Sequence, residues 1–397
     1  MHLSKIVVAV TVLAASAVWT GAAQAIPAFA RKEQAACNAC HTAWPMLNTV
    51  GRQYKENGYS FARGGGGNTE KISDFLEWDK HFPVTALLVS RPYDKKDSGT
   101  TKNRALHEVE LMVAGQLYRN VSGWFELEAE DEDDFAAGIK FGAVGYHPHK
   151  ALNVQVAWAH LLWADPYDTY ATTRLLTGPN RPQVINQSFG GADTPDGNQG
   201  RLRDQRQVLS VYGRPLNRLF YSVGYAGITN DTEGVEPSTY YGRLAFDVMP
   251  DTMAGLFAVK GSCAAVGVTR GNCLVDRDYR RSGMDFQIDV AGARLLAAYL
   301  KAEDDNAGAT ATVENDAWYA QGVYVFHENG RPTWVPLLRY DSYQKSNGTQ
   351  EYNEAVLSLT YYFTQNIKGF IEYWKQLDIP AGQTEDQRLT LQFVAAF

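Results

Sequence analysis

The sequence contains no long apolar run beyond its first 25 residues, only 4 cysteines, and no excess of basic side chains. A helix that spans a bilayer needs about 20 consecutive apolar residues, so a bundle of membrane helices is excluded. With 37 Lys and Arg against 44 Asp and Glu, the chain lacks the basic stripe that would neutralise phosphates, and we expect no nucleic-acid partner. We also find no catalytic triad, phosphate-binding loop or paired-carboxylate site.

Aromatic residues and glycine, by contrast, are plentiful for so polar a chain. The 397 residues include 9 Trp, 22 Tyr, 17 Phe and 35 Gly, while the mean hydropathy is only -0.32. This combination is typical of an all-β protein whose sheet has one solvated face, and a transmembrane β-barrel with a polar lumen has the same average composition.

The first 25 residues have the pattern of a secretory signal peptide. Lys5 is followed by an apolar run from Ile6 to Val18, and Ala23-Gln24-Ala25 has the small residues of a cleavage site. An uncleaved membrane anchor is disfavoured because this run is shorter than a spanning helix. We therefore expect an exported chain whose mature part begins at Ile26.

A haem-attachment motif follows at Cys37-Asn38-Ala39-Cys40-His41. In a C-x-x-C-H motif, both thiols can form thioethers with one porphyrin and the imidazole can ligate the iron. A redox dithiol or half of a zinc site is the alternative, but no second C-x-x-C completes a zinc cluster. The motif predicts one covalent haem c, attached at Cys37 and Cys40, with His41 as the proximal iron ligand.

The second axial ligand is left open by the sequence. Met46 and His81 are near in the chain, and Met112 or His107 could reach the iron only if the haem is held inside a barrel. A methionine ligand would raise the reduction potential relative to histidine. For each of these residues, packing for methionine and surface or lumen polarity for histidine is favoured over ligation, and a five-coordinate or water-ligated iron is a further alternative.

Residues 26–80 form a short haem segment with a glycine-rich linker at Gly64-Gly65-Gly66-Gly67-Asn68. A segment this short needs a cofactor or a neighbouring domain to complete a hydrophobic core. We therefore expect a short, helical cytochrome segment that docks as a plug or cap against a larger body.

Residues 81–397 predict that body to be a transmembrane antiparallel β-barrel of about sixteen strands. Apolar and polar residues alternate with period two in stretches long enough to cross a bilayer, which a soluble β-sandwich would not need. Short and long links alternate between the stretches, which places both ends of the barrel at the short-turn, periplasmic rim. The expected strands cover residues 82–91, 104–118, 121–131, 136–147, 151–163, 205–213, 218–228, 238–249, 252–260, 281–291, 293–302, 315–327, 332–341, 351–363, 367–376 and 387–397.

Two strands predict which face meets lipid. In 121–131, Phe125 and Leu127 alternate with Glu126 and Glu128, and in the last strand apolar residues up to Phe397 alternate with polar ones. Because successive side chains point to opposite faces, we expect an apolar outer face and a charged lumen.

The haem segment also resembles a known family. Ile26-Pro27-Ala28-Phe29-Ala30-Arg31, the motif of residues 37–41, Pro45, Leu47-Asn48, Gly51 and Asn57-Gly58-Tyr59 are together similar to the fused monohaem cytochrome-porin family of bacterial outer membranes. The best-known members of that family are ferrous-iron oxidases. About 35 residues carry the resemblance, whereas the barrel matches in architecture alone.

The resemblance implies a function as well as a fold. It implies thioethers at Cys37 and Cys40, ligation by His41, and a cytochrome segment in or at the periplasmic mouth of the barrel. It also implies electron flow from an extracellular donor, Fe(II) in the best-known members, to a soluble periplasmic c-type cytochrome. Only Thr42-Ala43-Trp44 separates His41 from Pro45, a shorter insert than iron-oxidising members tend to have, so the donor is less firmly implied than the fold.

An acidic cluster could bring a divalent cation to the haem. Carboxylate oxygens attract hard cations such as Fe²⁺, although acidic loops and porin lumens are also often simply solvated. The residues concerned are Glu126, Glu128, Glu130, Asp131, Glu132, Asp133 and Asp134, with Glu108 and Glu110 on the adjacent strand.

The remaining cysteines, Cys263 and Cys273, lie in one predicted external loop. In an oxidising compartment, a disulfide between them is favoured over metal binding.

Three functions follow from these patterns. The first is an outer-membrane iron oxidase that conducts electrons inward. The second is a diffusion porin whose haem segment is a plug or redox sensor. The third is an electron conduit with a donor other than iron or with the opposite direction of electron flow. The sequence leaves the oligomeric state open.

Overall fold

A computed structural model describes most of the chain. The predicted signal peptide and His81 lie outside the described residues. Among the residues that are described, no helix is long and apolar enough to cross a membrane. The described residues are 27–61, 69–74, 76–80, 83–187, 201–227, 239–263, 277–305 and 312–397.

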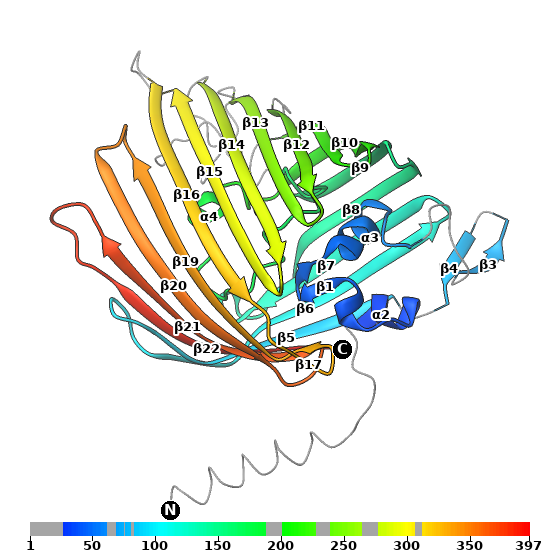
Figure 1. The fold of residues 1–397 in the computed structure, drawn as a ribbon, viewed down its shortest axis with the longest axis horizontal. Helices are drawn as coiled ribbons and strands as arrows, with labels where there is room; N and C mark the ends of the chain where they lie inside the picture. Colours follow the sequence, from blue (N-terminus) through cyan, green and yellow to red (C-terminus); the bar gives the residue numbers. More distant parts are fainter. Residues whose placement is uncertain are drawn as a thin grey trace, which may run out of the picture.

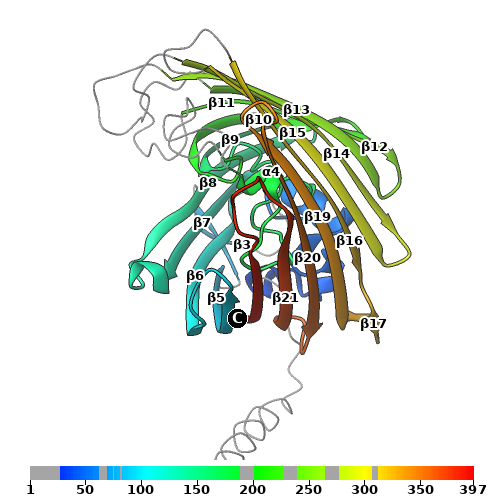
Figure 2. The same cartoon turned by 90° about the vertical axis from the view of Figure 1, so that its left-hand side faces the viewer.

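Sixteen long strands in the described residues close into one antiparallel barrel (Figures 1 and 2). The last strand pairs with the first, and Ala86 and Phe397 exchange backbone hydrogen bonds of 2.9 and 3.0 Å across this seam. Each strand corresponds to one predicted from the sequence. They are β5 (Val84–Lys96), β6 (Lys102–Tyr118), β7 (Val121–Glu130), β8 (Gly138–His149), β9 (Leu152–Ala159), β10 (Arg206–Leu216), β11 (Leu219–Ala226), β12 (Thr239–Met249), β13 (Thr252–Cys263), β14 (Arg277–Val290), β15 (Ala293–Asp305), β16 (Thr312–Tyr324), β19 (Trp334–Lys345), β20 (Gln350–Tyr362), β21 (Ile367–Asp378) and β22 (Gln387–Ala396).

The two faces of the strands differ as predicted. On β7, Phe125 is 37% exposed while Glu126 is 3% exposed, and on β22, Phe393 faces outward while Thr390 is fully buried. A barrel whose outer residues are apolar and whose inner residues are polar is the arrangement of outer-membrane proteins. The polar average composition is thus the mean of two unlike surfaces.

The rim where β5 begins and β22 ends carries the short turns. Between β14 and β15, Ala291 and Gly292 have φ angles of 49° and 86°, which is the two-residue turn that fits the twist of a hairpin. We call this edge the turn rim and the opposite edge, with the longer links, the loop rim.

The prediction for the fifth strand is wrong in its length. β9 ends at Ala159 instead of continuing to Trp163, because Leu161, Leu162 and Trp163 turn inward and are buried. Residues 160–187, which we call the inner segment, then run inside the barrel, and both views place α4 (Gln183–Asn186) within the ring of strands. Here Val184 and Ile185 are fully buried.

Another predicted strand is displaced for a similar reason. β16 ends at Tyr324, before the predicted residue 327, because β17 (His327–Glu328) pairs with β18 (Arg331–Pro332) in a separate small hairpin at the turn rim.

Residues 27–61, the N-terminal segment, are folded against the barrel at the turn rim. Arg31 donates from Nη2 to the Val84 carbonyl at 2.7 Å, Cys37 N donates to Gln365 Oε1 at 2.8 Å, and Tyr362 OH donates to the Trp44 carbonyl at 2.5 Å. The helices are small. The elements are α2 (Pro27–Glu33), η2 (Cys37–Ala39), β1 (His41–Ala43), β2 (Met46–Leu47) and α3 (Thr49–Glu56), followed outside the ring by the hairpin of β3 (Thr69–Ser73) and β4 (Leu76–Asp79).

Candidate functional site

A cavity of about 640 Å³ lies between the N-terminal segment, the inner segment and the wall formed by β5 to β8. Cys37, Cys40 and His41 line it from the N-terminal segment, and Met112 lines it from the barrel wall. Its volume is in the range of sites that hold small molecules and cofactors. The structure therefore brings the predicted haem motif to the edge of a partly open cavity inside the barrel.

Asn48 holds the turn of the C-x-x-C-H motif together. Its Nδ2 donates to the carbonyls of Asn38 and Ala39 at 3.1 Å, and its Oδ1 accepts from Gly51 N at 3.0 Å as the N-cap of α3. A Cβ on Gly51 would lie 2.1 Å from the Cys40 carbonyl oxygen. The motif therefore needs an asparagine cap and a glycine so that α3 can pack directly against it.

Backbone groups of the following hairpin hold the His41 imidazole. Its Nδ1 donates to the Pro45 carbonyl at 3.1 Å, because a carbonyl oxygen can only accept, and the Met46 backbone also hydrogen-bonds to the ring. With the proton on Nδ1, the lone pair is on Nε2, an arrangement found in imidazole metal ligands. Burial lowers the pKa of His41 to about 4, so the ring is neutral near pH 7, the form that coordinates metals.

Cys37 and Cys40 are unpaired thiols. Burial raises the pKa of Cys37 to about 12 and that of Cys40 to about 11. Both are therefore neutral, protonated thiols at the cavity edge.

Aromatic rings form another side of the cavity. The rings of Phe29 and Tyr59 stack with centroids 5.3 Å apart, and Tyr59 meets Trp124 at 5.4 Å. Trp124 meets Trp163 of the inner segment at 5.7 Å, and Trp163 stacks on Phe141 at 4.9 Å. These rings give the cavity broad apolar surfaces built from all three parts of the chain.

The other candidates for an axial ligand are placed differently. Met46 is buried but is absent from the cavity lining, while Met112 is on that lining. His107 is engaged at the loop rim, where its Nδ1 lies 2.7 Å from Asp131 Oδ1.

The predicted acidic residues divide into two groups. Glu126, Glu128 and Glu130 face the cavity from β7, whereas Asp131 and Glu132 form ion pairs with Arg104. Asp133 and Asp134 are exposed beyond the strand. The predicted acidic cluster is therefore divided into one group in the lumen and a separate group at the loop rim.

The lumenal glutamates continue onto β6. In the register of β6 and β7, Met112 pairs with Glu126. The next two inward-facing pairs toward the loop rim are both glutamates, Glu110 with Glu128 and Glu108 with Glu130. We call Glu108, Glu110, Glu126, Glu128 and Glu130 the glutamate ladder. Oxygens of Glu108, Glu128 and Glu130 lie within 4.8 Å of one another, as metal ligands do.

Lys140 on β8 sits among these carboxylates. Its Nζ lies 3.4 Å from Glu108 and 3.3 Å from Glu110, and it also contacts Glu128. A cationic group thus occupies the place where carboxylate oxygens converge.

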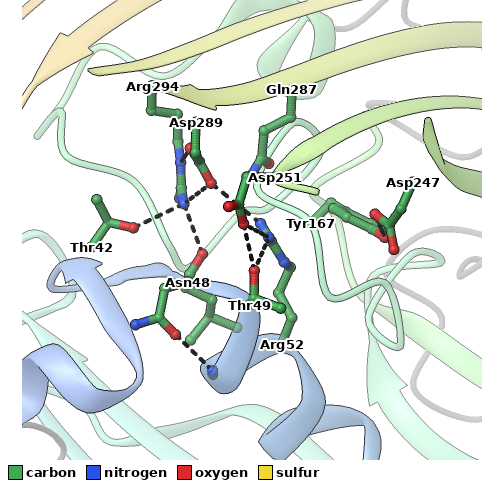
Figure 3. Close-up of polar contacts among 12 residues, drawn as sticks. Thr42, Asn48, Thr49, Arg52, Tyr167, Asp247, Asp251, Gln287, Asp289 and Arg294 are labelled. Carbon is green, nitrogen blue, oxygen red and sulfur yellow. Dashed lines mark hydrogen bonds and ion pairs between the residues drawn. The ribbon is translucent and has the colours of Figure 1, made fainter. Parts of the chain in front are cut away.

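Buried charges that the sequence did not reveal anchor the N-terminal segment (Figure 3). Arg294 is fully buried and donates from Nη2 to Thr42 Oγ1 at 3.0 Å and to the Leu47 carbonyl at 2.9 Å. It also pairs with Asp289 and with Asp168 of the inner segment. Alternation predicts that such an arginine points inward, but no sequence signal tells which segment it meets.

The inner segment is fixed to the barrel wall in the same way. Arg243 pairs with Asp165 at 2.8 Å and with Asp285 at 2.5 Å. Lys55 of α3 donates to the carbonyls of Trp163 and Asp165. The two segments therefore contact each other and the wall, and both occupy the lumen.

The predicted disulfide is not described. Cys273 and the side chain of Cys263 lie outside the described residues, so the pairing stays a prediction.

Comparison with known proteins identifies the fold alone. No protein-family model matches the sequence, and no curated protein matches it. Solved porin structures are similar: an anion-selective porin from Comamonas acidovorans has a TM-score of 0.58 at 15% identity, with 79% of this chain and 98% of that chain covered. In vitro folded OmpT, an outer membrane protein of Vibrio cholerae, has a TM-score of 0.55 at 10% identity, covering 82% of this chain and 100% of that one. Salmonella typhi OmpF in complex with daunomycin has a TM-score of 0.54 at 14% identity, covering 80% and 98%. The chain thus has a porin-like, sixteen-strand outer-membrane barrel fold.

Proposed function

We propose that this protein is an outer-membrane electron-transfer protein with one covalent haem c inside a porin-like barrel. The observation that carries the proposal is the position of the C-x-x-C-H motif, which opens onto a barrel-enclosed cavity of about 640 Å³. The sequence resemblance to the fused monohaem cytochrome-porins supports the same function. The apolar outer face, the predicted signal peptide and the porin-like fold support a location in the lipid of the bacterial outer membrane.

The residues around the cavity fit a haem. A thioether-linked porphyrin needs two unpaired thiols three positions apart, a neutral imidazole and flat aromatic walls, and the cavity offers all of these. Cys37 and Cys40 would hold the porphyrin covalently, and His41, fixed by the Pro45 carbonyl, would ligate its iron. When bound, the haem would supply one-electron redox chemistry.

Fe(II) is the donor that the glutamate ladder favours. Its five carboxylates lead from the loop rim to the cavity, and carboxylate oxygens bind hard divalent cations. Each Fe(II) gives up one electron and becomes Fe(III), and a soluble periplasmic c-type cytochrome at the turn rim takes that electron up. As an enzyme, the protein is then a ferrous-iron:cytochrome c oxidoreductase. A sulfur compound or an organic shuttle is the alternative donor.

The test begins with the purified full-length protein. Its haem should stay attached in a denaturing gel and in the peptide that contains residues 37–41, and Cys37→Ser with Cys40→Ser should abolish that attachment. Anaerobic Fe(II) should then reduce the ferric haem in stopped-flow absorbance. A protein exported without attached haem would refute the proposal, and attached haem that Fe(II) leaves oxidised would refute iron as donor.

A diffusion porin with a haem-bearing plug or redox sensor is the second candidate, because the barrel resembles porins. In this candidate, small solutes would pass around the N-terminal and inner segments. Single-channel conductance in planar bilayers separates the two functions. The electron-transfer proposal expects low conductance in the full chain, whereas a porin-like conductance together with a haem inert to donors favours diffusion.

A further inference from the structure

Two parts of the chain contribute unlike metal-binding groups to the cavity lining. Of the described residues that line it, His41 is the one histidine and Met112 the one methionine. Met112 lies on β6 and is 7% exposed, and it belongs to the same apolar cluster as Cys37, Met46 and Leu87. Met112 and the attachment motif thus border one cavity although Met112 is 75 positions from Cys37 in the sequence.

Met46 is close to the motif but does not line the cavity. In the small hairpin of β1 and β2, Met46 pairs with Ala43, and the preceding Pro45 carbonyl holds His41 Nδ1. The Met46 backbone also hydrogen-bonds to the imidazole. The Met46 side chain is 1% exposed and is absent from the cavity lining.

Three other side chains on the lining that could ligate iron have partners already. Lys55 Nζ donates to the carbonyls of Trp163 and Asp165 at 2.5 and 2.9 Å, and Lys140 is held by the glutamate ladder. Glu126 accepts a hydrogen bond from Trp124 Nε1 at 3.1 Å. Met112 is a soft thioether in an apolar setting, which suits haem iron.

We infer that the Met112 thioether is the second axial ligand of the haem iron, so that one ligand comes from the N-terminal segment and the other from the barrel wall. This inference rests on the proposed function. A thioether ligand raises the reduction potential relative to a second histidine, which favours uptake of an electron from a weak reductant such as Fe(II). Because Met112 pairs with Glu126 and is two residues from Glu110 on the same face, the ligand also lies at the inner end of the glutamate ladder.

The experiment compares Met112→Leu with Met46→Leu in the full-length haem-loaded protein. Leucine keeps most of the volume of methionine, so both variants change chemistry more than packing. Wild type and Met46→Leu should show the far-red ferric absorption band of a thioether-ligated, low-spin haem. Met112→Leu should lose that band, bind added imidazole more readily, and have a lower reduction potential. Met112→His should stay low-spin without the band, also at a lower potential.

The readouts separate this inference from the proposed function. A wild-type protein without covalent haem would remove the proposed function, whereas covalent haem without a thioether signature would overturn only the assignment of Met112. A signature that persists in Met112→Leu, or that disappears in Met46→Leu, also overturns it. Should Met112→Leu fail to fold, near-infrared magnetic circular dichroism of the wild-type protein still reports whether a thioether ligates the iron.

Discussion

Charged residues are arranged in opposite ways in two regions of the lumen. Around the anchor of the N-terminal segment, three arginines (Arg52, Arg174 and Arg294) meet three aspartates (Asp168, Asp251 and Asp289). In the glutamate ladder, Lys140 is the one cation among the described residues that forms ion pairs, and it pairs with three of the five carboxylates, those of Glu108, Glu110 and Glu128. Matched charges hold segments together because an uncompensated buried charge is very unfavourable. Surplus carboxylates are what a site for a passing cation requires.

The largest effect should come from breaking the anchor with Arg294→Met. This change leaves Asp168 and Asp289 without the fully buried guanidinium, and breaking such a buried pair destabilises by about 3–5 kcal/mol. We expect the N-terminal segment to become sensitive to limited proteolysis while the barrel keeps its heat-modifiable migration on gels.

Arg388→Met is the matched control. Arg388 also pairs with an aspartate, Asp94, but its side chain is 22% exposed and lies toward the loop rim. If both variants release the N-terminal segment equally, the anchor has no special role.

A smaller effect should follow from Gly51→Ala in the haem motif. The added Cβ would lie 2.1 Å from the Cys40 carbonyl oxygen, and overpacking of this kind costs about 1–3 kcal/mol. If the proposed function holds, the covalent haem per protein should fall, as measured by absorbance after denaturation. Gly138→Ala is the control because nothing lies within 4 Å of its Cβ position, and an equal loss of haem there would contradict this reading of Gly51.

The barrel could be predicted from the sequence because the alternation of side chains within each strand indicates which face points outward. Period-two alternation, as in Phe125 and Glu126, is local information, and all sixteen predicted strands are found. The inner segment was missed because Leu161 and Trp163 continue the apolar pattern of β9 after the backbone has left the wall. Which residues fill a lumen depends on contacts between distant segments, and alternation carries no such information.

The candidate site was predictable to a similar degree. The C-x-x-C-H motif is a contiguous pattern, so its residues could be picked out directly, whereas the preference for Met112 over Met46 required knowing which of them lines the cavity. The anchor through Arg294 could not be foreseen, because its partners Thr42 and Leu47 lie about 250 positions away.

Removing Lys140, the cation paired with the glutamate ladder, should increase the difference in charge balance between the ladder and the anchor of the N-terminal segment. In Lys140→Gln, the glutamate ladder loses its only ion-pair partner among the described residues, so a divalent cation no longer competes with an ammonium group. We expect affinity for redox-inert Mn²⁺ to rise at least about tenfold, or about 1.4 kcal/mol, in isothermal titration calorimetry.

Lys301→Gln is the control for that titration. Lys301 also bridges two glutamates, Glu303 and Glu314, at 3.0 and 3.1 Å, but its side chain is 36% exposed. An equal gain in Mn²⁺ affinity there, or no gain in Lys140→Gln, would show that the ladder is an ordinary solvated surface.

The smallest effect should come from Asp386 in the link before β22, which shows what the same chemistry contributes in solvent. Although burial acts to raise it, hydrogen bonds from Ser98 and Lys96 lower the pKa of Asp386 to about 2. A carboxyl group with a lowered pKa stabilises the folded state above its unfolded pKa of about 3.9, and that contribution disappears as the pH falls toward 2. Because Lys96 is 48% exposed, solvent screening limits the contribution to under about 1 kcal/mol.

Asp386→Asn should therefore lower the thermal midpoint slightly at pH 7 and hardly at all near pH 2. If Asp386→Asn lost as much stability at pH 7 as Arg294→Met, burial would not be what distinguishes the anchor. An ion pair at the exposed rim would then contribute as much to stability as a fully buried one.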